Sequence, residues 1–524
     1  MNHRNGGAAV VDTLAVHGVD TVFGIPGTHN LEIYRHLQAQ HLRVVTPRHE
    51  QGAGYAAEAY ARVSGRPGVV VTTSGPGLTN VMTAAATAYA ESQPLLVLSP
   101  GMPTGTEGRD LGQLHEAKNT SAAMGELVAW SRRVRSAEEA ADAVTAAFAG
   151  FTGRRPRPVH VEIPVDVFTQ SWSGQARVAP SVRAVAADQG AVLRAAEVLA
   201  AAQRPLIIAG GGGVDAQAEI TALAEALGAP VATTVNGKGV VAESHPLSVG
   251  ASVRLRALQK AAADSDALLV VGSELGDSDL WEGEIRGRTV IRCDIDSAQL
   301  DKNCPADHAL LGDAAATVAA LAAGMGPGSG GGAERAAALR AACRDEAAGD
   351  AGPNAEINAA VRAALPPEGV LTGDSSQVTY FGSVHFFDMA RPRRFCYSPG
   401  FATLGYGLPA AVGAAAARPG QPVAVLLGDG ALMFSVQELM TLTELRLPVP
   451  IVVVDNGGYR EIRDQETARG IAPIGVDLQT PDFAALAVAM GAHGARTTSS
   501  ADLTDLVSRA FDADRPTVIH FDLR

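Results

Sequence analysis

The sequence predicts an α/β fold built from mostly parallel sheets with helices on both faces. Short, continuous apolar stretches of strand length alternate with longer helical stretches throughout the chain, which is typical of buried parallel strands. The chain has 57 Gly and only 5% aromatic residues, which favours many tight turns and close backbone contacts. Its 524 residues suggest about three domains, at roughly 100 to 200 residues per domain.

The first domain is expected over residues 1–175. Each of its strands is a short apolar run beside a helical stretch, as in a parallel sheet. The polar segment 164–180 is interpreted as a connector. The predicted helices are 8–18, 30–39 and 79–91, and the predicted strands are 20–24, 68–73, 94–99 and 158–163.

Two further domains are expected over 185–325 and 350–524. The second has predicted helices at 189–203 and 215–227 and predicted strands at 205–209, 230–235, 267–272 and 289–294. It ends in the glycine-rich run 324–332, whose composition indicates a flexible linker. The third has predicted strands at 369–373, 421–427, 449–455 and 516–522, and helices at 405–417, 434–446 and 481–490.

Composition excludes several classes of protein. Lys and Arg total 42 against 55 Asp and Glu, a net charge of −13 without a dense basic block, so we expect no nucleic-acid partner. The chain has no leader-like apolar stretch at its start and no window of 18 uninterrupted apolar residues, so we expect no membrane segment. The four cysteines are scattered without metal-site spacing, so we expect reduced thiols in a cytoplasmic protein.

Two predicted strand ends in the third domain carry residues suited to a metal ion. The segment 428–431 (Gly-Asp-Gly-Ala) follows one strand and 455–458 (Asp-Asn-Gly-Gly) ends the next. Because the carboxyl ends of parallel strands open on one crevice, Asp429 and Asn456 are expected to converge there. With a backbone carbonyl and two phosphate oxygens they would suit Mg²⁺. Either turn alone is an ordinary β-to-α connection, since Asp-Gly and Asn-Gly are common turn dipeptides.

Together, Gly-Asp-Gly and the Asn that follows after 25 residues resemble the signature of thiamin diphosphate-dependent enzymes. The resemblance implies a thiamin diphosphate-binding fold with thiamin diphosphate and Mg²⁺ as cofactors. It also implies Asp429, Asn456 and the carbonyl oxygen of Gly458 as metal ligands. The chain departs from the family at Asp455, which stands where the first Asn of the usual pair lies, while the ligand position is kept as Asn456.

The segment 46–56 resembles the stretch that bears the cofactor-activating glutamate of these enzymes, which maps onto Glu50. The family's chemistry implies that Glu50 donates a proton to the pyrimidine N1′ in a dry pocket. The alternative is a helix N-terminal acid stabilised by the helix dipole. Further matches imply cofactor contacts from Thr73, Pro76, Ser376, Gln377, Ala402, Leu404, Gly428, Gly430 and Ala431, although Leu404 alone is typical of plain core.

The resemblance covers essentially the whole chain, in the order pyrimidine-binding, central and diphosphate-binding domain. This is the order of the acetolactate synthase, pyruvate oxidase and benzoylformate decarboxylase group. In that group Glu50 of one subunit would meet the diphosphate half-site of another, so a homodimer or homotetramer is implied. The central run Gly210–Gly213 lacks a dinucleotide fingerprint, because Asp215 replaces its third glycine. We therefore expect a structural central domain, which disfavours a nicotinamide or flavin oxidoreductase.

Segments 24–35, 46–55 and 114–116 most resemble the 5-guanidino-2-oxopentanoate decarboxylase branch of this group. This implies that a small 2-oxo acid, with a polar or guanidino side chain, is decarboxylated to an aldehyde. His29 and His115 are candidate catalytic residues as proton donors or carboxylate holders, and surface histidines are the alternative. A guanidinium would need a carboxylate fork, for which Glu116, Glu461 and Asp464 are candidates.

Glu461 is also a candidate catalytic residue, and its alternative is an exposed helix acid that pairs with Arg460 or Arg463. The expected substrate contacts are Thr28, His29, His115, Glu116 and Glu461. Two other functions stay open: an acetolactate-synthase-like carboligase that joins two carbonyl compounds, and a non-catalytic thiamin-fold protein, against which Glu50 argues.

Overall fold

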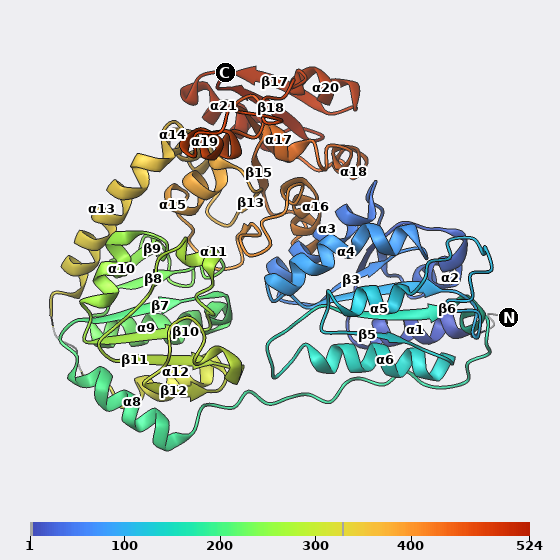
Figure 1. The fold of residues 1–524 in the computed structure, drawn as a ribbon, viewed down its shortest axis with the longest axis horizontal. Helices are drawn as coiled ribbons and strands as arrows, with labels where there is room; N and C mark the ends of the chain where they lie inside the picture. Colours follow the sequence, from blue (N-terminus) through green and yellow to red (C-terminus); the bar gives the residue numbers. More distant parts are fainter. Residues whose placement is uncertain (1–3, 327–329) are drawn as a thin grey trace.

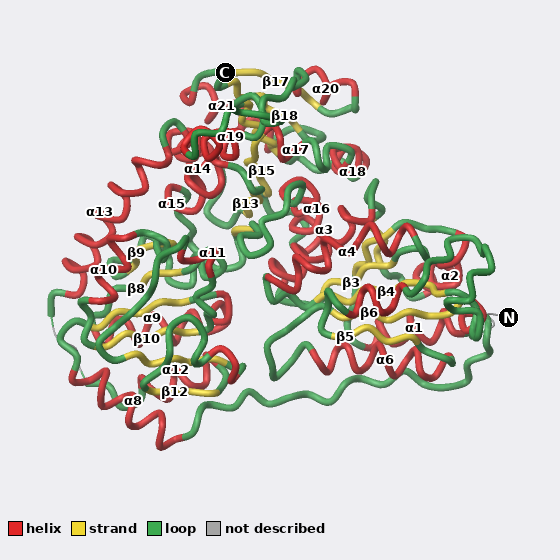
Figure 2. Tube along the Cα trace, in the orientation of Figure 1, coloured by secondary structure: helices red, strands yellow, loops and turns green. Residues whose placement is uncertain are grey.

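The computed structural model describes residues 4–326 and 330–524, and they form three six-stranded sheets. Each sheet comes from a different third of the chain, and every described pair of neighbouring strands is parallel. Helices lie on both sides of the strands (Figures 1 and 2). The predicted fold class is therefore confirmed.

The first sheet has the strand order β2-β1-β3-β4-β6-β5. Its strands are β1 (Thr21–Gly24), β2 (Arg43–Val45), β3 (Gly68–Val71), β4 (Leu95–Gly101), β5 (Trp130–Arg133) and β6 (Val159–Pro164). Its helices are α1 (Gly6–Val16), α2 (Leu31–Ala39), α3 (Glu50–Ser64), α4 (Pro76–Ala90), α5 (Thr120–Gly125), α6 (Ala137–Gly150) and α7 (Val165–Phe168), and η1 (Thr28–Asn30) is a single 3₁₀ turn. The predicted strands hold to within a few residues, but β2 and β5 escaped prediction because both are short and incompletely buried.

The second sheet has the order β12-β11-β10-β7-β8-β9. Its strands are β7 (Pro205–Ala209), β8 (Val231–Thr233), β9 (Ser248–Ala251), β10 (Ala267–Val271), β11 (Val290–Asp294) and β12 (His308–Leu311). Its helices are α8 (Gln189–Ala201), α9 (Gln217–Leu227), α10 (Arg256–Ala263), α11 (Asp277–Leu280) and α12 (Ala314–Ala322), with 3₁₀ turns η2 (Gly211–Ala216) and η3 (Ser297–Gln299).

The third sheet has the order β14-β13-β15-β16-β18-β17. Its strands are β13 (Val370–Gly373), β14 (Phe395–Cys396), β15 (Val423–Gly428), β16 (Pro450–Asp455), β17 (His493–Thr497) and β18 (Thr517–Asp522). Helix α13 (Gly332–Ala351) packs beside α10 and β9 of the second sheet and leads into the third. The helices of the third sheet are α14 (Asn354–Ala364), the π-helical turn η4 (Val378–Ser383), α15 (Val384–Phe386), α16 (Gly407–Ala417), α17 (Asp429–Leu432), α18 (Glu438–Glu444), α19 (Arg460–Ala468), α20 (Phe483–Ala489) and α21 (Ser500–Phe511).

Three sequence-based expectations need correction. The helix predicted at 434–446 begins only at Glu438, because the chain makes separate turns after the short helix α17. The predicted glycine linker already enters α13 at Gly332, and its residues 327–329 lie outside the described residues. The predicted connector 164–180 begins with the helix α7, and the irregular chain that joins the first two sheets runs on to Asp188 (Figure 1).

The first and third sheets share one hydrophobic core. Helix α3 packs against α16 across this core, and small residues allow the two backbones to approach closely. At Gly413 an added Cβ would lie only 1.9 Å from the carbonyl oxygen of Ala56, so no larger residue fits. This contact fixes the orientation of α3, which bears Glu50 at its first turn. In the described part of the chain, no helix is both long and apolar enough to span a membrane.

Candidate active site

A cavity of about 680 Å³ lies at the carboxyl ends of β13, β15 and β16, which is where ligands bind in open parallel sheets. It collects residues from four segments of the third part of the chain, 375–385, 397–404, 428–431 and 456–465, and helix α19 forms part of its rim. The predicted cofactor, metal and substrate residues that line it are Ser376, Gln377, Ala402, Leu404, Gly428, Asp429, Gly430, Ala431, Asn456, Gly458 and Glu461. We call these residues the third-sheet half-site.

Two oxygens of this half-site are buried without a hydrogen-bond partner among the described residues. They are Oδ2 of Asp429 and Oδ1 of Asn456, from the ends of β15 and β16. Burial, together with the nearby carboxylate of Asp455, raises the pKa of Asp429 to about 6. Buried acceptors are costly unless something satisfies them, and a carboxylate with an amide oxygen suits a hard cation. The residues present therefore fit Mg²⁺ held together with a diphosphate.

Glycines at the two strand ends leave no room for side chains. An added Cβ at Gly430 would lie 3.0 Å from the ring of Tyr459, and one at Gly458 would lie 2.3 Å from the carbonyl oxygen of Val476. Gly458 also has φ +128°, a conformation that residues with side chains rarely adopt. These glycines keep the turns narrow, so backbone atoms can reach a ligand in the cavity.

Asp455, the departure from the family signature, is fully buried and well satisfied. Its Oδ2 accepts hydrogen bonds from Thr480 Oγ1 at 2.9 Å and from His520 Nε2 at 3.0 Å. Its Oδ1 accepts from the backbone N–H of Gly457 at 3.1 Å, and Nε of Arg524 lies 3.5 Å from Oδ2. The negative charge that Asp455 adds is thus stabilised by its own hydrogen-bond partners, next to Asn456 in the chain.

The loop that carries Ala402 and Leu404, residues 398–407, is fixed at several points. Ala402 has φ +50°, an unfavourable value for a residue with a side chain, so its surroundings must hold it there. At the start of the loop, Glu91 accepts hydrogen bonds from Ser398 Oγ and from the N–H of Gly400. In the middle, the hydroxyl of Tyr55 forms a hydrogen bond of 2.6 Å with Thr403 Oγ1. At the end, Asp374 accepts from the N–H groups of Gly405 and Gly407, and Glu58 accepts from the Tyr406 hydroxyl. We call this set the 398–407 clamp.

The clamp includes a buried ionic cluster at the junction of the three sheets. Arg62 on α3 lies 2.7 Å from Glu58 and 3.4 Å from Glu91, and both carboxylates are fully buried. Asn236 from the second sheet bonds both Arg62 and Glu91. Burial raises the pKa of Glu58. A broken buried pair is strongly destabilising, so this cluster fixes the relative position of α3 and the 398–407 loop.

The first sheet gathers a second group of predicted residues at its carboxyl edge. Glu50 is buried at the start of α3, and its Oε2 accepts a hydrogen bond from Asn80 Nδ2 at 2.9 Å. Pro76 begins α4, and an added Cβ on Gly77 would lie 3.2 Å from Glu50 Oε1. The hydroxyl of Thr73 is buried without a hydrogen-bond partner in the described residues. We call Glu50, Thr73, Pro76, Thr28, His29, Ser74 and His115 the first-sheet half-site.

Two histidines of the first-sheet half-site meet at Ser74. Nδ1 of His29 lies 2.6 Å from Ser74 Oγ, and Nδ1 of His115 lies 3.2 Å from the same atom. Thr28 starts the short turn η1 that presents His29. The carboxylate of Glu116, a predicted substrate contact, accepts hydrogen bonds from the backbone N–H groups of Leu111 and Gln113, so it stabilises its own loop.

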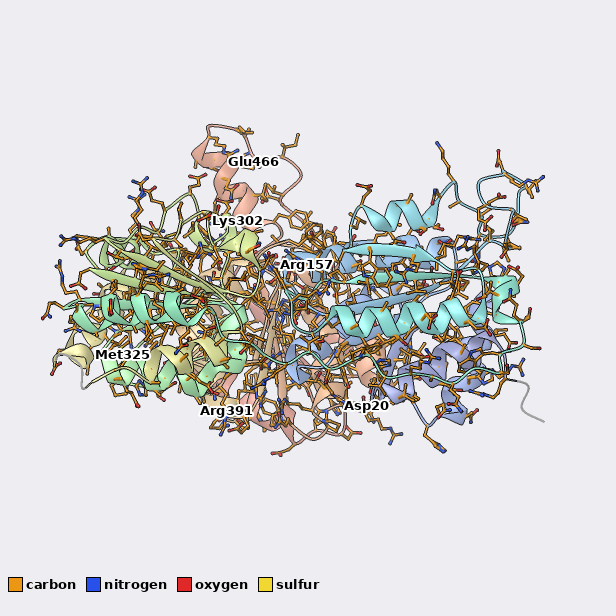
Figure 3. All side chains as sticks on the ribbon, turned by 90° about the horizontal axis from the view of Figure 1, so that it is seen from below. Asp20, Arg157, Lys302, Met325, Arg391 and Glu466 are labelled. Atoms are coloured by element: carbon orange, nitrogen blue, oxygen red, sulfur yellow. The ribbon has the colours of Figure 1, made fainter. Side chains whose placement is uncertain are left out.

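The two half-sites are separate within one chain. Of the residues that the structure describes, none before Thr233 lines the cavity of the third-sheet half-site. Glu50, which the sequence predicts to act on the same cofactor as Asp429, therefore lies outside it. Helix α19 has no buried residue, and Figure 3 shows its Glu466 standing out from the surrounding fold. Exposed apolar side chains also border the cavity loops, among them Phe401, Met433 and Phe434.

Acidic residues missed by sequence reasoning line the cavity from the second sheet. They are Asp277 and Asp279 on α11 and Glu282 just after it. Burial and the nearby carboxylates of Glu91 and Glu274 raise the pKa of Asp279 to about 7. In the described residues none of the three forms an ion pair, whereas the lining Arg254 pairs with Asp350. The signal in the sequence was the Asp-Ser-Asp run shortly after the strand predicted at 267–272.

Glu461 points to the same cavity without a cationic partner in the described residues. Its Oε2 accepts from Gln377 Nε2 at 3.0 Å and its Oε1 from Gln465 Nε2 at 2.9 Å. The alternative ion pairs with Arg460 or Arg463 do not form, because those arginines pair with Asp464 and Asp477. The cavity wall therefore carries uncompensated negative charge.

The glycine run of the second sheet lies where two chain segments approach closely, and Gly211 and Gly212 also line a separate cavity of about 350 Å³. An added Cβ on Gly212 would lie 2.8 Å from the Cα of Gly272, and one on Gly210 would lie 2.4 Å from the carbonyl oxygen of Gly272. Asp215, at the place of the third fingerprint glycine, forms an ion pair with Arg393 at 2.8 Å. These contacts explain the glycines by the close approach of β7 and β10.

The three parallel sheets, the oxygen site at the strand ends and the separate buried glutamate define an enzyme that binds thiamin diphosphate, also called thiamine pyrophosphate, with Mg²⁺ as the usual partner metal. Three domain families match the chain: the N-terminal TPP binding domain of thiamine pyrophosphate enzymes over residues 4–123, the central domain over 192–321 and the C-terminal TPP binding domain over 374–521. The chain belongs to the thiamine pyrophosphate enzyme family.

Curated relatives with different printed functions match almost the whole chain. A probable 2-ketoarginine decarboxylase of Pseudomonas aeruginosa is 40% identical over 93% of this chain and 88% of its own length. A probable acetolactate synthase large subunit of Methanocaldococcus jannaschii is 32% identical over 98% of this chain and 90% of its own length. The acetolactate synthase isozyme 2 large subunit of Escherichia coli is 32% identical, with 98% and 95% covered.

Proposed function

We propose that this protein is a thiamin diphosphate- and Mg²⁺-dependent decarboxylase that converts a 2-oxo acid into an aldehyde and CO₂. The main support is the similarity to the 2-ketoarginine decarboxylase, which at 40% identity exceeds the 32% of the acetolactate synthases reported above. When bound, thiamin diphosphate supplies a nucleophilic carbon and an electron sink for the bond that breaks as CO₂ leaves.

The protein's own residues have separate tasks in this proposal. Asp429, Asn456 and the Gly458 carbonyl would hold the metal, and the backbone at Gly428, Gly430 and Ala431 would bind the diphosphate together with Ser376 and Gln377. Glu50 would hold the proton that activates the pyrimidine, near Thr73 and Pro76. Leu404 would support the cofactor rings, and the carbonyl of Ala402 would accept a hydrogen bond from the pyrimidine amine. His29 and His115 deliver the proton that replaces CO₂, beside Thr28.

We further propose a substrate with a cationic side chain such as a guanidinium. The supporting observation is a set of cavity carboxylates without a cationic partner among the described residues: Glu461, Asp277 and Glu282. Asp279 adds a further carboxyl group, which its pKa of about 7 leaves partly protonated at neutral pH. Carboxylates recognise a guanidinium through paired, charge-assisted hydrogen bonds. Glu116 is the weakest of the earlier candidates, because both its oxygens are engaged in its own loop.

The active unit proposed is a homodimer or a homotetramer of such dimers. Within one chain the first-sheet half-site and the third-sheet half-site do not line a common cavity. A second copy that brings its Glu50 to this cavity would complete the site and cover exposed apolar residues such as Phe401 and Phe434.

The four cysteines are free and buried, which supports the proposed cytoplasmic location. We propose 1–175, 185–325 and 350–524 as the domain limits.

The decisive experiment is product analysis of the purified holoenzyme on a panel of 2-oxo acids. The panel includes pyruvate, an apolar homologue and 5-guanidino-2-oxopentanoate. The proposal expects the guanidino substrate to be preferred and an aldehyde to be released. If pyruvate is the best substrate and acetolactate the main product, the carboligase alternative replaces it, in keeping with the acetolactate synthase relatives.

A further inference from the structure

Ser74 lies between His29 and His115, the two predicted catalytic histidines, and the sequence predicted no role for it. Its hydroxyl is 2.6 Å from Nδ1 of His29 and 3.2 Å from Nδ1 of His115. The two rings meet edge to face with centroids 5.5 Å apart. Because Ser74 is only 1% exposed, water has little access to replace either hydrogen bond.

Three loops fix this arrangement at the carboxyl edge of the first sheet. His29 follows β1, Ser74 follows β3 and His115 lies in the long loop after β4. Gly75 has φ +57°, and an added Cβ there would lie 2.4 Å from the carbonyl oxygen of His115. His115 itself has φ +64°, which shows that its surroundings hold it in an unfavourable backbone conformation.

Counting hydrogens constrains the two rings. A serine hydroxyl has one proton, so it can donate to only one of the two Nδ1 atoms. The other Nδ1 must then carry a proton and donate to Ser74 Oγ. With both rings neutral, one histidine is protonated at Nδ1 and the other at Nε2, so their outer Nε2 atoms have opposite roles, one acceptor and one donor.

When a proton arrives at the Nε2 atom that lacks one, both shared protons can move along the two hydrogen bonds and a proton can leave from the other Nε2. Only these movements together exchange the roles of the two rings. The charged state with two imidazolium rings is disfavoured, because burial and the neighbouring His115 lower the pKa of His29. The pair is thus suited to carry one proton at a time.

We propose that Ser74 is a positioning residue that couples His29 and His115 into one proton relay. This inference rests on the proposed function. Conversion of a 2-oxo acid anion to an aldehyde and CO₂ consumes one proton: the bond to the carboxylate breaks, and its electron pair forms the new C–H bond with that proton. The relay delivers the proton from one Nε2 and recovers another from solvent at the other Nε2. In carboligation the same carbon instead forms a C–C bond to a second carbonyl.

The test compares products in the holoenzyme variant Ser74→Ala. Aldehyde release is expected to slow by about 100-fold, the low end of the contribution that a positioned proton donor typically makes. The hydroxyketone formed with an added aldehyde should fall much less, so the ratio of aldehyde to hydroxyketone drops. Thiamin diphosphate binding should be unchanged. Ser74→Thr, which restores a hydroxyl, should recover most of the ratio.

Ser99→Ala is the matched control. Ser99 is also buried on the first sheet, and its hydroxyl lies 2.8 Å from Nε2 of His160. The Ser99→Ala substitution removes a serine–histidine hydrogen bond of the same kind outside both half-sites. The ratio of aldehyde to hydroxyketone should therefore stay at the wild-type value. Ser74→Cys, nearly the same size but a weak donor, should change the ratio in the same direction if Ser74→Ala folds poorly.

Nitrogen-15 spectra of histidine-labelled holoenzyme give a readout independent of turnover. The wild type should contain one Nδ1-protonated and one Nε2-protonated ring, assigned with His29→Gln and His115→Gln. In Ser74→Ala this pairing should be lost. Equal losses of both products, or an unchanged ratio with unchanged tautomers, would overturn the relay. If the wild type releases no aldehyde from any 2-oxo acid, the proposed function fails, and the tautomer spectra still decide whether Ser74 couples the rings.

Discussion

The two half-sites differ in what they leave unpaired. In the third-sheet half-site, the buried atoms without a partner among the described residues include the acceptor oxygens Asp429 Oδ2 and Asn456 Oδ1. Around the first-sheet half-site they are the hydroxyls of Tyr34, Thr72 and Thr73, which can donate. Acceptor oxygens without a hydrogen-bond partner favour binding of a cation, whereas hydroxyls without a partner can form hydrogen bonds with the polar atoms of an uncharged ring. In the proposed function, the ionic part of cofactor binding and the proton chemistry would therefore be built on different sheets.

The largest expected effect comes from removing the cation site. Asp429→Ala should abolish cofactor retention and reduce activity by more than about a hundredfold, since a bound metal supplies several kcal/mol of stabilisation. Trp281 lines the cavity, so its fluorescence should report thiamin diphosphate binding in the presence of Mg²⁺. Asp514→Ala, an exposed acid of the same sheet region that pairs with Arg515, is the control. Full activity of chelated, cofactor-stripped protein would refute the site.

The second effect separates binding from proton chemistry. Glu50→Gln should leave thiamin diphosphate bound and slow exchange of its C2 proton by about 10²- to 10⁴-fold, because an amide fills the same volume but cannot supply the carboxyl proton. Exchange is measured by NMR of the deuterated complex. A wild-type exchange rate in this variant would mean that Glu50 only stabilises the start of α3.

The third prediction combines the two half-sites. Coexpressed Glu50→Gln and Asp429→Ala chains should form hybrid dimers with one intact site of two. If the chains mix at random, half the dimers are hybrid, so about a quarter of the wild-type specific activity should return. Activity is compared with each variant alone. An active species with the mass of a single chain, or no recovery in proven hybrids, would contradict the shared site.

A smaller and selective effect is expected at the acidic wall of the cavity. Glu461→Gln or Asp279→Asn should lower kcat/KM for a guanidino substrate by about 10- to 100-fold, since a charge-assisted hydrogen bond contributes about 1.5 to 3 kcal/mol. The value for pyruvate should hardly change. Asp477→Asn, which affects an exposed acid paired with Arg463, is the control. Equal losses for both substrates would remove these residues from tail recognition.

The smallest effect concerns stability. The folded-state pKa of Asp279 is about 7 against an ordinary value of 3.8, so the folded state binds this proton more tightly than the unfolded state. The ionised form of Asp279 therefore lowers the free energy of unfolding. This loss grows between pH 3.8 and 7 and is largest above pH 7. Asp279→Asn should stabilise the protein by about 1 to 3 kcal/mol at pH 8 and not below pH 4, as thermal melts would show. An equal gain at both pH values would mean that charge is not the cause.

The sequence was sufficient to place polar residues that directly follow predicted strands. Asp429 and Asn456 could be placed together because both follow apolar strands, and parallel strands end at one edge of a sheet. The buried strands were predicted well because each is a continuous apolar run. Helix α13 was missed, since it follows a glycine-rich run and its sequence lacks a clear apolar face.

Contacts between distant segments could not be predicted. The acids of α11 reach the cavity only because the second sheet packs beside the third, and no local pattern contains that contact. The use of Glu116 as a loop acceptor depends on the turn 111–116, whose geometry the sequence does not specify. Ser74 was visible as a strand-end serine, but its position between two histidines arises from three separate loops.

Helix α3 has one further consequence for an assembled dimer. Its first residue, Glu50, belongs to the first-sheet half-site, whereas Tyr55 and Glu58 hold the 398–407 loop of the same chain's third-sheet half-site. At 1.5 Å per residue, Glu50 and Glu58 are about 12 Å apart along the helix. In the proposed dimer these two ends serve different active sites. One continuous helix would therefore join the 398–407 loop of one site to the activating acid of the other, so the positions of these two groups would be linked by the backbone of α3.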